Sequence, residues 1–217
     1  MAAQNQNKVS LPVIKRLPKY YRYISDMHNN GIVKVSSSEL ARMMGTTASQ
    51  VRQDFNCFGG FGQQGYGYSV GKLKKEISHI LGLDQRYNVI IIGAGRIGQA
   101  LMGYKNFMLE GFNVVDIFDN DPLKVGTEIE GREVQNIAML DSYLKDKSID
   151  IAIICTPKEY AQQSADLLVS FGIKAVWNFA PADVAVRRGV AVENVHLSDS
   201  LYVLSYKLKE KIKGTGI

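Results

Sequence analysis

The chain has 217 residues, a length that suggests about two domains, and its 46% hydrophobic and 22% charged residues are ordinary for a folded protein. Its two cysteines, Cys57 and Cys155, lie far apart, which excludes a disulfide framework and favours a reducing compartment. The N-terminus lacks the apolar core of a signal peptide, and no apolar run approaches the ~20 residues of a membrane span, so we expect a cytoplasmic protein with no membrane partner.

Charge is distributed unevenly along the chain. Residues 1–80 carry 11 lysines and arginines against 4 aspartates and glutamates, a balance of +7, whereas residues 81–217 carry 15 against 17, a balance of −2. A basic segment joined to a slightly acidic one indicates that only the first segment meets a polyanion such as nucleic acid. A generically basic domain without such a partner is the alternative.

Residues 1–82 are expected to form a small helical domain. Pro18 opens a helical pattern that continues through Ile24 and Met27 and ends near Gly31. This placement uses the preference of proline for a first helical turn, where its missing N–H is not needed.

The next stretch, VSSSELARMMGTTASQVRQDFNCFG, has the spacing of a helix-turn-helix. A serine among residues 36–38 can cap a first helix, Gly45 breaks it, and Thr46 or Thr47 can cap a second helix. The polar outer side of that second helix gives the first predicted DNA-binding residues, which are Ser49, Gln50, Arg52 and Gln53. Any small helical hairpin has a similar pattern, so a role without DNA stays open.

The segment FGGFGQQGYGYSV follows at once and predicts a β-hairpin that would form a wing. It alternates glycines with the aromatic residues Phe58, Phe61, Tyr66 and Tyr68, which a flexible linker rarely contains. Gln63 and Gln64 fall near the expected tip and join the predicted DNA-binding set. A flexible glycine linker is the alternative. A helix over 72–81 then leads to the domain boundary.

From Tyr87 the chain alternates strand and helix patterns, which predicts a parallel sheet with βαβ connections over residues 83–197. We expect strands at about 88–92, 113–118, 149–154, 173–177 and 190–195. After Ser198 the leucines recur at helical spacing, so residues 198–217 should contain a final amphipathic helix. The predicted fold class is α/β, with an N-terminal winged helix-turn-helix domain followed by a Rossmann-type parallel-sheet domain and a C-terminal helix.

A glycine-rich motif follows the first strand of this sheet and opens a helix expected from Gln99 to about Glu110. Its residues, all predicted to bind a cofactor, are Gly93, Ala94, Gly95, Arg96, Ile97 and Gly98. The first glycine permits the turn, the second lets a pyrophosphate approach the backbone, and the third lets helix and strand pack closely. A domain that binds no ligand, or one that binds coenzyme A, is the alternative.

Asp119 ends the second strand, 21 positions beyond Gly98, which is close to the spacing of an acidic residue that binds the adenosine ribose. Its carboxylate can accept hydrogen bonds from the ribose hydroxyls. A 2′-phosphate would meet this carboxylate with Asp121 close by and no neighbouring arginine. NAD(H) is therefore favoured over NADP(H).

Two later strands end in loops that should line the same crevice, because ligands bind at the carboxyl ends of parallel strands. These loops add Thr156, Pro157, Asn178 and Phe179 to the predicted cofactor site. A dehydrogenase would also need an acid–base group. Of the three histidines only His196 could approach this region, and no Lys–Asp or Tyr–Lys pair sits at a strand end. The cofactor is therefore predicted to act as a signal, and an NAD-dependent enzyme is the alternative.

With these motifs in place, the chain resembles the Rex family of bacterial redox-sensing transcriptional repressors. The likeness covers residues 9–213 and is carried by IKRLPKYYRY, the helix pair, FGGFGQQGYGY, GAGRIGQAL, FDNDP and NFAP. It implies a homodimer with exchanged last helices that binds palindromic, double-stranded operator DNA. It also implies NADH and NAD+ as ligands, with NADH releasing the DNA and NAD+ compatible with binding.

The resemblance also implies roles for single residues. Arg16 would contact DNA, Arg96 and the three glycines would hold the pyrophosphate, and Tyr104 would lie beside the nicotinamide. Arg22 would exchange partners with a carboxylate near the last helix.

This chain departs from the family pattern at three places. Gln53 and the Gln63-Gln64 pair stand where the family usually has basic residues, and His196 stands where it usually has aspartate. Fewer cations predict a shallower salt dependence of DNA binding. A neutral imidazole predicts a weaker partner for Arg22 than a carboxylate.

Overall fold

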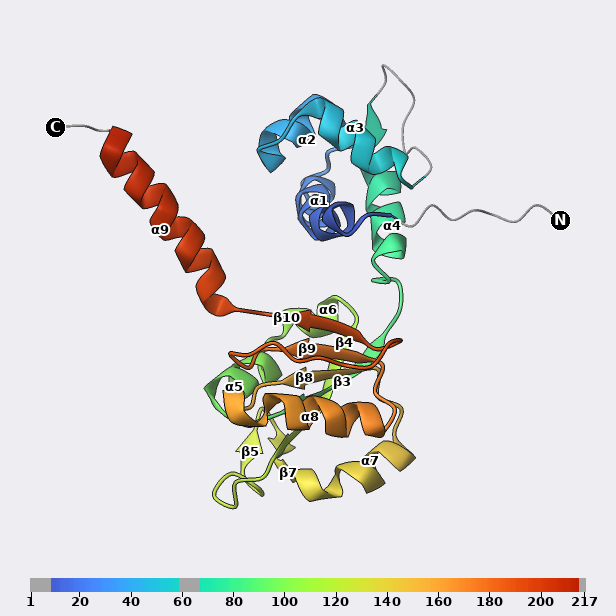
Figure 1. Cartoon of the computed structure of the whole chain (residues 1–217). Coiled ribbons are helices and arrows are strands. Elements are labelled where there is room, and N and C mark those ends of the chain that lie inside the picture. The colour runs from blue at the N-terminus through green and yellow to red at the C-terminus, as the bar shows by residue number, and fades with distance from the viewer. Residues whose placement is uncertain (1–8, 59–66, 215–217) are drawn as a thin grey trace. The chain divides into compact units, whose positions relative to one another are not determined.

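The structure is a computed structural model that describes residues 9–58 and 67–214. The chain divides into two compact units, a first unit of Met1–Gln85 and a second unit of Arg86–Ile217 (Figure 1). Each unit has its own hydrophobic core and is described by itself. Among the described residues, no helix is both long and apolar enough to cross a membrane.

Four helices pack around one core in the described part of the first unit. They are α1 (Leu11–Asn29), α2 (Ser37–Met44), α3 (Ala48–Asn56) and α4 (Val70–Ile80). Leu17, Tyr20 and Ile24 of α1 are fully buried in this core. The ring centroids of Tyr20 and Phe55 lie 4.9 Å apart, so this aromatic pair fixes α3 against α1.

Helix α1 begins earlier than the sequence predicted. It starts at Leu11 with Pro12 in its first turn, and Pro18 lies inside the helix rather than at its beginning. A proline inside a helix removes one backbone hydrogen bond, which is why the pattern favoured a later start. Burial outweighs that loss, because Val13 and Leu17 extend the buried stripe of the helix toward the N-terminus.

The predicted helix-turn-helix is formed by α2 and α3, and local interactions set the ends of both helices. The Ser36 hydroxyl accepts the Glu39 amide at 3.1 Å, while the Glu39 carboxylate accepts the Ser36 amide at 2.7 Å, which makes a capping box. Gly45 ends α2 in the left-handed conformation, with φ of 68°. The Thr47 hydroxyl caps α3 by accepting the Gln50 amide at 3.1 Å.

Strands β1 (Lys34–Val35) and β2 (Tyr68–Ser69) form a short antiparallel pair, which the sequence did not predict. Gly67 precedes β2 with φ of 72°, and a side chain there would lie 2.8 Å from the Val35 carbonyl oxygen. The Tyr68 ring meets the Phe55 ring edge-on at 5.1 Å, so the returning strand is packed onto α3. The expected tip of the wing, with Gln63 and Gln64, lies outside the described residues.

The second unit contains a six-stranded parallel sheet with the order β10-β9-β8-β3-β4-β7. Its strands are β3 (Tyr87–Ile92), β4 (Phe112–Asp119), β7 (Gln135–Asn136), β8 (Ile151–Ile154), β9 (Ala175–Asn178) and β10 (Ala191–Asn194). Strands β4 and β7 lie on one side of β3, and the later strands β8, β9 and β10 lie on its other side. This order is that of a Rossmann fold, and its switch point lies between β3 and β8.

The five predicted strands are confirmed to within a few residues, but the structure adds short strands that the sequence did not predict. These are β7 at one edge of the sheet and the hairpin of β5 (Glu128–Ile129) and β6 (Arg132–Glu133). Strands of two residues carry no periodic pattern, so the hydropathy pattern could not predict them.

Helices cover both faces of the sheet (Figure 1). One face packs against η1 (Ile137–Met139), α7 (Leu140–Asp146) and α8 (Lys158–Ser170). The other face packs against α5 (Arg96–Met102), and α6 (Asn106–Leu109) lies beside β4. Because both faces are buried, the strands read as continuous apolar runs such as Val89–Ile92.

The helix after the glycine motif differs from the prediction of a single helix from Gln99 to Glu110. Helix α5 begins at Arg96 and ends at Met102, and α6 is a separate turn. Gly103 ends α5, where a side chain would lie 3.1 Å from the Glu130 carboxylate. Glycine weakens a helix at this point, so the chain turns before α6.

Helix α9 (Leu197–Gly214) closes the described chain, one residue earlier than the expected start at Ser198. Leu201, Leu204 and Leu208 lie on one side of it and are 62%, 59% and 58% exposed. An apolar stripe of this kind is normally buried against another surface.

Candidate functional site

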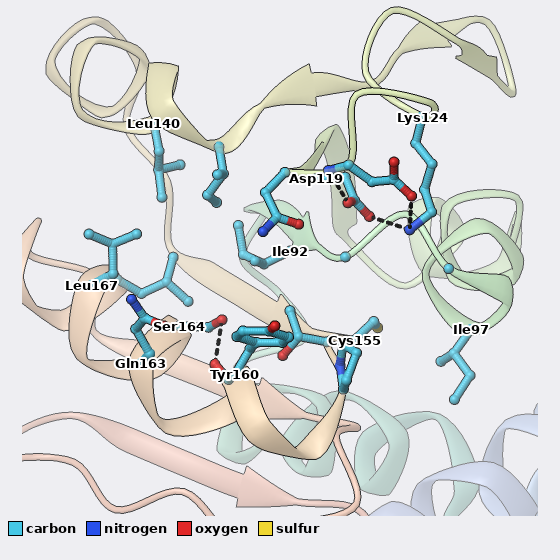
Figure 2. Close-up of a pocket in the computed structure, with 18 of the residues that line it drawn as sticks. Ile92, Ile97, Asp119, Lys124, Leu140, Cys155, Tyr160, Gln163, Ser164 and Leu167 are labelled. Carbon is cyan, nitrogen blue, oxygen red and sulfur yellow. Dashed lines mark hydrogen bonds and ion pairs between the residues drawn. The ribbon is translucent and has the colours of Figure 1, made fainter.

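A cavity of about 780 Å³ opens at the carboxyl ends of β3, β4 and β8 (Figure 2). Seven of the predicted cofactor residues line it, namely Gly93, Gly95, Arg96, Ile97, Asp119, Thr156 and Pro157. The cavity therefore lies at the switch point of the sheet, where a Rossmann fold binds its ligand. Its size falls in the range of small-molecule and cofactor sites.

The glycine motif forms the turn from β3 into α5. Gly93 has φ of 105°, and a side chain there would lie 2.7 Å from the Cys155 carbonyl oxygen, so only glycine fits between β3 and β8. A side chain at Gly98 would collide with the Gly93 carbonyl oxygen. By contrast, nothing lies within 4 Å of a side chain built at Gly95, which leaves open space beside the backbone where a ligand can approach. Ala94 is buried behind the turn.

Asp119 at the end of β4 is 7% exposed and lies in a dense hydrogen-bond network. Its Oδ2 accepts the Ala94 amide at 2.7 Å and the Lys124 ammonium at 3.1 Å, and its Oδ1 accepts the Asp121 amide at 2.9 Å. Burial alone would raise the pKa of Asp119, but the bonds from the two amides and from Lys124 outweigh burial and lower its pKa. Asp119 is therefore ionised at neutral pH and ties the glycine turn to the end of β4.

The sequence missed the opposite walls of the cavity. One wall is apolar and comes from Ile137 and Leu140 on the segment that leads into α7. The other wall is α8, which contributes Tyr160, Gln163, Ser164, Leu167 and Leu168. Spacing of three and four residues on α8 is the signal that could have assigned this face to the cavity. An apolar wall that faces a second wall with leucine side chains and the Gln163 amide suits a flat heterocycle such as adenine.

Cys155 and Thr156 follow β8 and form the floor of the cavity. Burial raises the pKa of the Cys155 thiol to about 12, so the thiol stays protonated and unreactive. The Thr156 hydroxyl oxygen is buried and lacks a partner among the described residues. A buried hydroxyl without a partner is unfavourable, which indicates that a ligand or water completes this site.

Five predicted cofactor residues do not line the cavity, namely Ala94 and Gly98 of the glycine turn, and Tyr104, Phe179 and Asn178. Tyr104 and Phe179 belong to a row of aromatic rings on the α5 side of the sheet, with centroid distances of 4.7 Å from Tyr104 to Phe107, 5.8 Å from Phe107 to Trp177 and 4.6 Å from Trp177 to Phe179. Tyr104 is half exposed at the end of this row. Tyr104 and Phe179 stay predicted for the nicotinamide end of a dinucleotide.

Asn178, the last of these residues, is fully buried. Its amide nitrogen donates to the Ala182 carbonyl at 2.6 Å and to the Asn194 side-chain oxygen at 2.8 Å, while its oxygen accepts the Ala180 amide at 3.0 Å. The structure thus uses Asn178 to connect the loop after β9 to β10. Any effect of Asn178 on a ligand would act through the position of that loop.

The predicted DNA-binding residues of α3 share the outer side of the helix. Ser49, Arg52 and Gln53 are exposed, and the Arg52 guanidinium donates to the Ser37 hydroxyl at 3.1 Å. This arrangement leaves the outer face of α3 polar and open, as a recognition helix requires.

Beneath that face, a buried carboxylate that the sequence did not single out organises the helices. Asp54 of α3 is fully buried and accepts hydrogen bonds from Arg16 Nε at 2.7 Å and Nη2 at 2.6 Å. It also accepts the Tyr20 hydroxyl at 3.0 Å and the Gln50 amide nitrogen at 2.8 Å. Two predicted DNA-binding side chains, Arg16 and Gln50, are therefore held by Asp54, which joins α1 to α3.

His196 lies directly before α9 and pairs with a carboxylate of its own unit. Its Nε2 lies 2.8 Å from an Asp183 carboxylate oxygen. Arg22, the partner implied by the resemblance, belongs to the first unit and lies over the Tyr23 ring at 5.7 Å. The hydrogen bond that His196 donates to the Asp183 carboxylate raises the pKa of His196 above its ordinary value.

We expect Asp183→Asn to lower the pKa of His196 toward the ordinary value for histidine, because the variant loses the carboxylate that accepts its hydrogen bond. Because folding raises the pKa of His196, the His196–Asp183 pair stabilises the wild-type protein fully at a pH below the pKa of this histidine in the unfolded chain. This stabilisation is lost as the pH rises through the pKa of His196 in the folded protein. An NMR titration of the three histidines measures the change. His79 pairs with Asp84 at 2.7 Å and serves as the internal control, since its pKa should not move. An unchanged His196 pKa in the variant would exclude Asp183 as its partner.

Two family models match the two parts of the chain. One, described as a putative DNA-binding protein N-terminus, matches residues 8–56, and the other, described as a CoA binding domain, matches residues 84–182. Among solved structures, the crystal structure of RSP, a Rex-family repressor, has a TM-score of 0.88 at 49% identity and covers 94% of this chain and 95% of that one. RSP in complex with beta-NAD+ and operator DNA has a TM-score of 0.87 at 50% identity, over 96% and 99% of the two chains.

Curated relatives agree with these structures over almost the whole chain. The redox-sensing transcriptional repressor Rex of Caldicellulosiruptor saccharolyticus is 53% identical over 207 residues, which cover 95% of this chain and 94% of the relative. The protein of the same description from Clostridium botulinum is 53% identical over 200 residues, covering 92% and 95%. An α2–α3 recognition motif, a Rossmann cavity and this identity lead to one conclusion: the chain belongs to the Rex family of redox-sensing transcriptional repressors.

Proposed function

We propose that this chain binds palindromic operator DNA as a homodimer in the cytoplasm and that NADH, bound in the cavity of the second unit, releases it from the DNA. The observation that carries the proposal is the combination of an open recognition helix with a dinucleotide cavity in one chain. Relatives of about 50% identity were crystallised with beta-NAD+ and operator DNA and with beta-NADH, which supports both ligands.

The cavity favours NAD(H) over coenzyme A. Coenzyme A carries a phosphate on its adenosine ribose, and that phosphate would meet the carboxylates of Asp119 and Asp121. The two free ribose hydroxyls of NAD(H) instead suit an ionised carboxylate that accepts hydrogen bonds. The buried Thr156 hydroxyl and the open space beside Gly95 then fall near the pyrophosphate. Arg96, at the start of α5, supplies a cation to the same region.

DNA binding is proposed for the outer face of α3, with Arg16 and the wing. Ser49, Arg52 and Gln53 would reach base edges or phosphates, and glutamine can bond adenine in the major groove. Gln63 and Gln64 are proposed for the wing tip. Residues 1–80 have a charge balance of +7, but among the predicted DNA-binding residues of α3 only Arg52 is a cation. The salt dependence of operator binding should therefore be shallow.

The homodimer is proposed to form through α9. A second copy of the chain would cover the exposed leucine stripe of this helix, and the same contact would hold two recognition helices at the spacing of a palindrome. The cofactor would act as a signal, so the protein would regulate and not turn over its ligand.

NADH and NAD+ differ only at the nicotinamide ring, so that ring must carry the signal. A ligand shifts an equilibrium only through different affinities for the two states. Tyr104, Phe179 and Leu197 at the start of α9 are the candidates to sense the ring. Closure around NADH would then turn the two recognition helices out of register with the two half-sites of the operator.

The proposal predicts that operator DNA weakens NADH binding by the same factor by which NADH weakens operator binding. A factor of about ten needs only ~1.4 kcal/mol of coupling, within the ordinary allosteric range. Energy transfer from Trp177, the one tryptophan of the chain, to bound NADH can report the affinity with and without saturating operator. Equal affinities in the two titrations would contradict the signalling role.

Two controls separate the alternatives. Coenzyme A should not displace NADH, whereas tight competition would favour a coenzyme A protein. NADH absorbance should stay constant during incubation with the protein, whereas its loss with any added substrate would favour an enzyme.

A further inference from the structure

Lys124 lies at the ribose end of the cavity, in a position that the sequence did not single out. Its ammonium is 3.1 Å from Asp119 Oδ2 and 3.5 Å from the Asp121 carboxylate. Figure 2 shows the ion pair between Lys124 and Asp119 at the cavity wall. Lys124 also lines the cavity and is 39% exposed, so a ligand can reach it.

The hydrogen bonds already made by Asp119 limit what it can offer a ligand. Each carboxylate oxygen accepts about two hydrogen bonds. Oδ2 has two donors, the Ala94 amide and Lys124, whereas Oδ1 has only the Asp121 amide. Asp119 thus has room for about one ribose hydroxyl. Lys124 has three N–H groups and directs two toward carboxylates, so the third can meet a second oxygen of the ribose.

The charges at this corner decide what the third N–H can hold. Asp119 and Asp121 together carry two negative charges, and Lys124 neutralises one of them. The hydrogen bond that Lys124 donates to Asp119 raises the pKa of Lys124, so the ammonium stays charged. A phosphate on the ribose would therefore meet a net negative charge. Lys124 could bind such a phosphate, but its ammonium is already paired with Asp119 and Asp121. Like charges at such distances are strongly unfavourable in a partly buried site.

We propose that Lys124 is a specificity-determining residue whose pairing with Asp119 and Asp121 keeps a phosphate-binding cation occupied, so that the site accepts a ribose 2′-hydroxyl and rejects a 2′-phosphate. The inference rests on the proposed NAD(H) site and adds the residue that sets its selectivity. It follows that the relative affinity for NADPH rises when Asp119 and Asp121 lose their charge, and that this rise requires Lys124.

The test compares NADH and NADPH binding in four full-length proteins. Wild type should bind NADPH at least about tenfold more weakly than NADH, which corresponds to ~1.4 kcal/mol. In Asp119→Asn/Asp121→Asn, the ratio of the two affinities should move toward NADPH by at least about tenfold. Adding Lys124→Met to this pair should remove that gain. Lys145→Met on α7, which breaks an exposed ion pair with Asp141 of 2.6 Å, is the matched control and should leave both affinities unchanged.

Each outcome separates this inference from the function on which it rests. A wild type that binds neither nucleotide contradicts the NAD(H) site itself. A wild type that binds both equally, or a triple variant that keeps the gain of the double variant, overturns the role of Lys124 while leaving the site in place. If circular dichroism shows that the double variant does not fold, Asp121→Asn with and without Lys124→Met tests the same change, because Asp119 then keeps its amide partners. If Asp121→Asn and Asp121→Asn/Lys124→Met have the same ratio of NADH to NADPH affinity, the inference is also overturned.

Discussion

Asp54→Ala is expected to lower the free energy of unfolding by about 2–4 kcal/mol and to remove most specific operator binding. The carboxylate is fully buried, and its loss leaves the Arg16 cation and the Tyr20 hydroxyl without their acceptor. Breaking a buried ion pair by removing one partner typically costs about 3–5 kcal/mol. We reduce that figure because the Arg16 side chain is 33% exposed and water can take part of its charge. Urea unfolding measures the change.

The pH dependence of the free energy of unfolding gives a second test of the role of Asp54. Burial alone would raise the pKa of Asp54, but hydrogen bonds from Arg16, Gln50 and Tyr20 outweigh burial and lower its pKa. The stabilisation by Asp54 is therefore present above the unfolded pKa and is lost as the pH falls through the folded pKa. Asp54→Asn removes the charge but keeps a hydrogen-bond acceptor, so its stability should depend less on acid than that of wild type.

Arg52→Ala is the matched control for Asp54→Ala. Arg52 is exposed on the same helix, and its guanidinium makes a surface hydrogen bond to the Ser37 hydroxyl, so stability should stay near that of wild type. Operator affinity should fall by roughly 1–3 kcal/mol if Arg52 reads a base. Asp54→Ala should lose both properties. If it kept the stability of wild type, the ion pair would not be what holds α3 on α1.

The sequence predicted those features of the chain that depend on local chemistry or on a long period. Ser36, Gly45 and Thr47 mark the helix-turn-helix because a cap needs a hydroxyl or a left-handed glycine at one position. The glycine motif and Asp119 carry a fixed spacing, and the strands of the sheet are buried on both faces. These signals need no knowledge of tertiary contacts.

The features that the sequence did not predict depend on contacts between distant segments. Asp54 looks like any polar residue of a helix until Arg16, 38 positions earlier, is placed against it. Pro18 looks like a helix start until the buried stripe of α1 is known. The α8 wall of the cavity likewise follows from the packing of α8 against the sheet. Pair contacts of this kind leave no periodic pattern in a single sequence.

Truncation after Val195 is expected to convert the proposed homodimer to a monomer and to weaken operator binding by at least about 100-fold. The truncation removes α9, whose residues Leu201, Leu204 and Leu208 present an apolar stripe that is more than half exposed in one chain. When two DNA-binding units are joined, the second half-site is bound at a high effective concentration, which contributes a factor of ~10²–10⁴ without any new contact. Monomers lose that factor although each recognition helix is intact. Sedimentation and operator titration measure the two effects.

A point variant separates the loss of the dimer from the loss of the helix. Leu204→Lys/Leu208→Lys places two charges in the stripe and keeps residues of good helix propensity, so the second unit should stay folded and bind NADH. It should nevertheless behave as the truncated chain does in sedimentation and on the operator. Lys207→Glu on the same helix, outside this leucine stripe, should leave the dimer intact. A truncated chain that stays dimeric would contradict the role of α9, because the dimer would then be held by another surface. Equal operator affinities of monomer and dimer would instead contradict the palindromic mode of binding, since two half-sites add affinity only when one assembly reaches both.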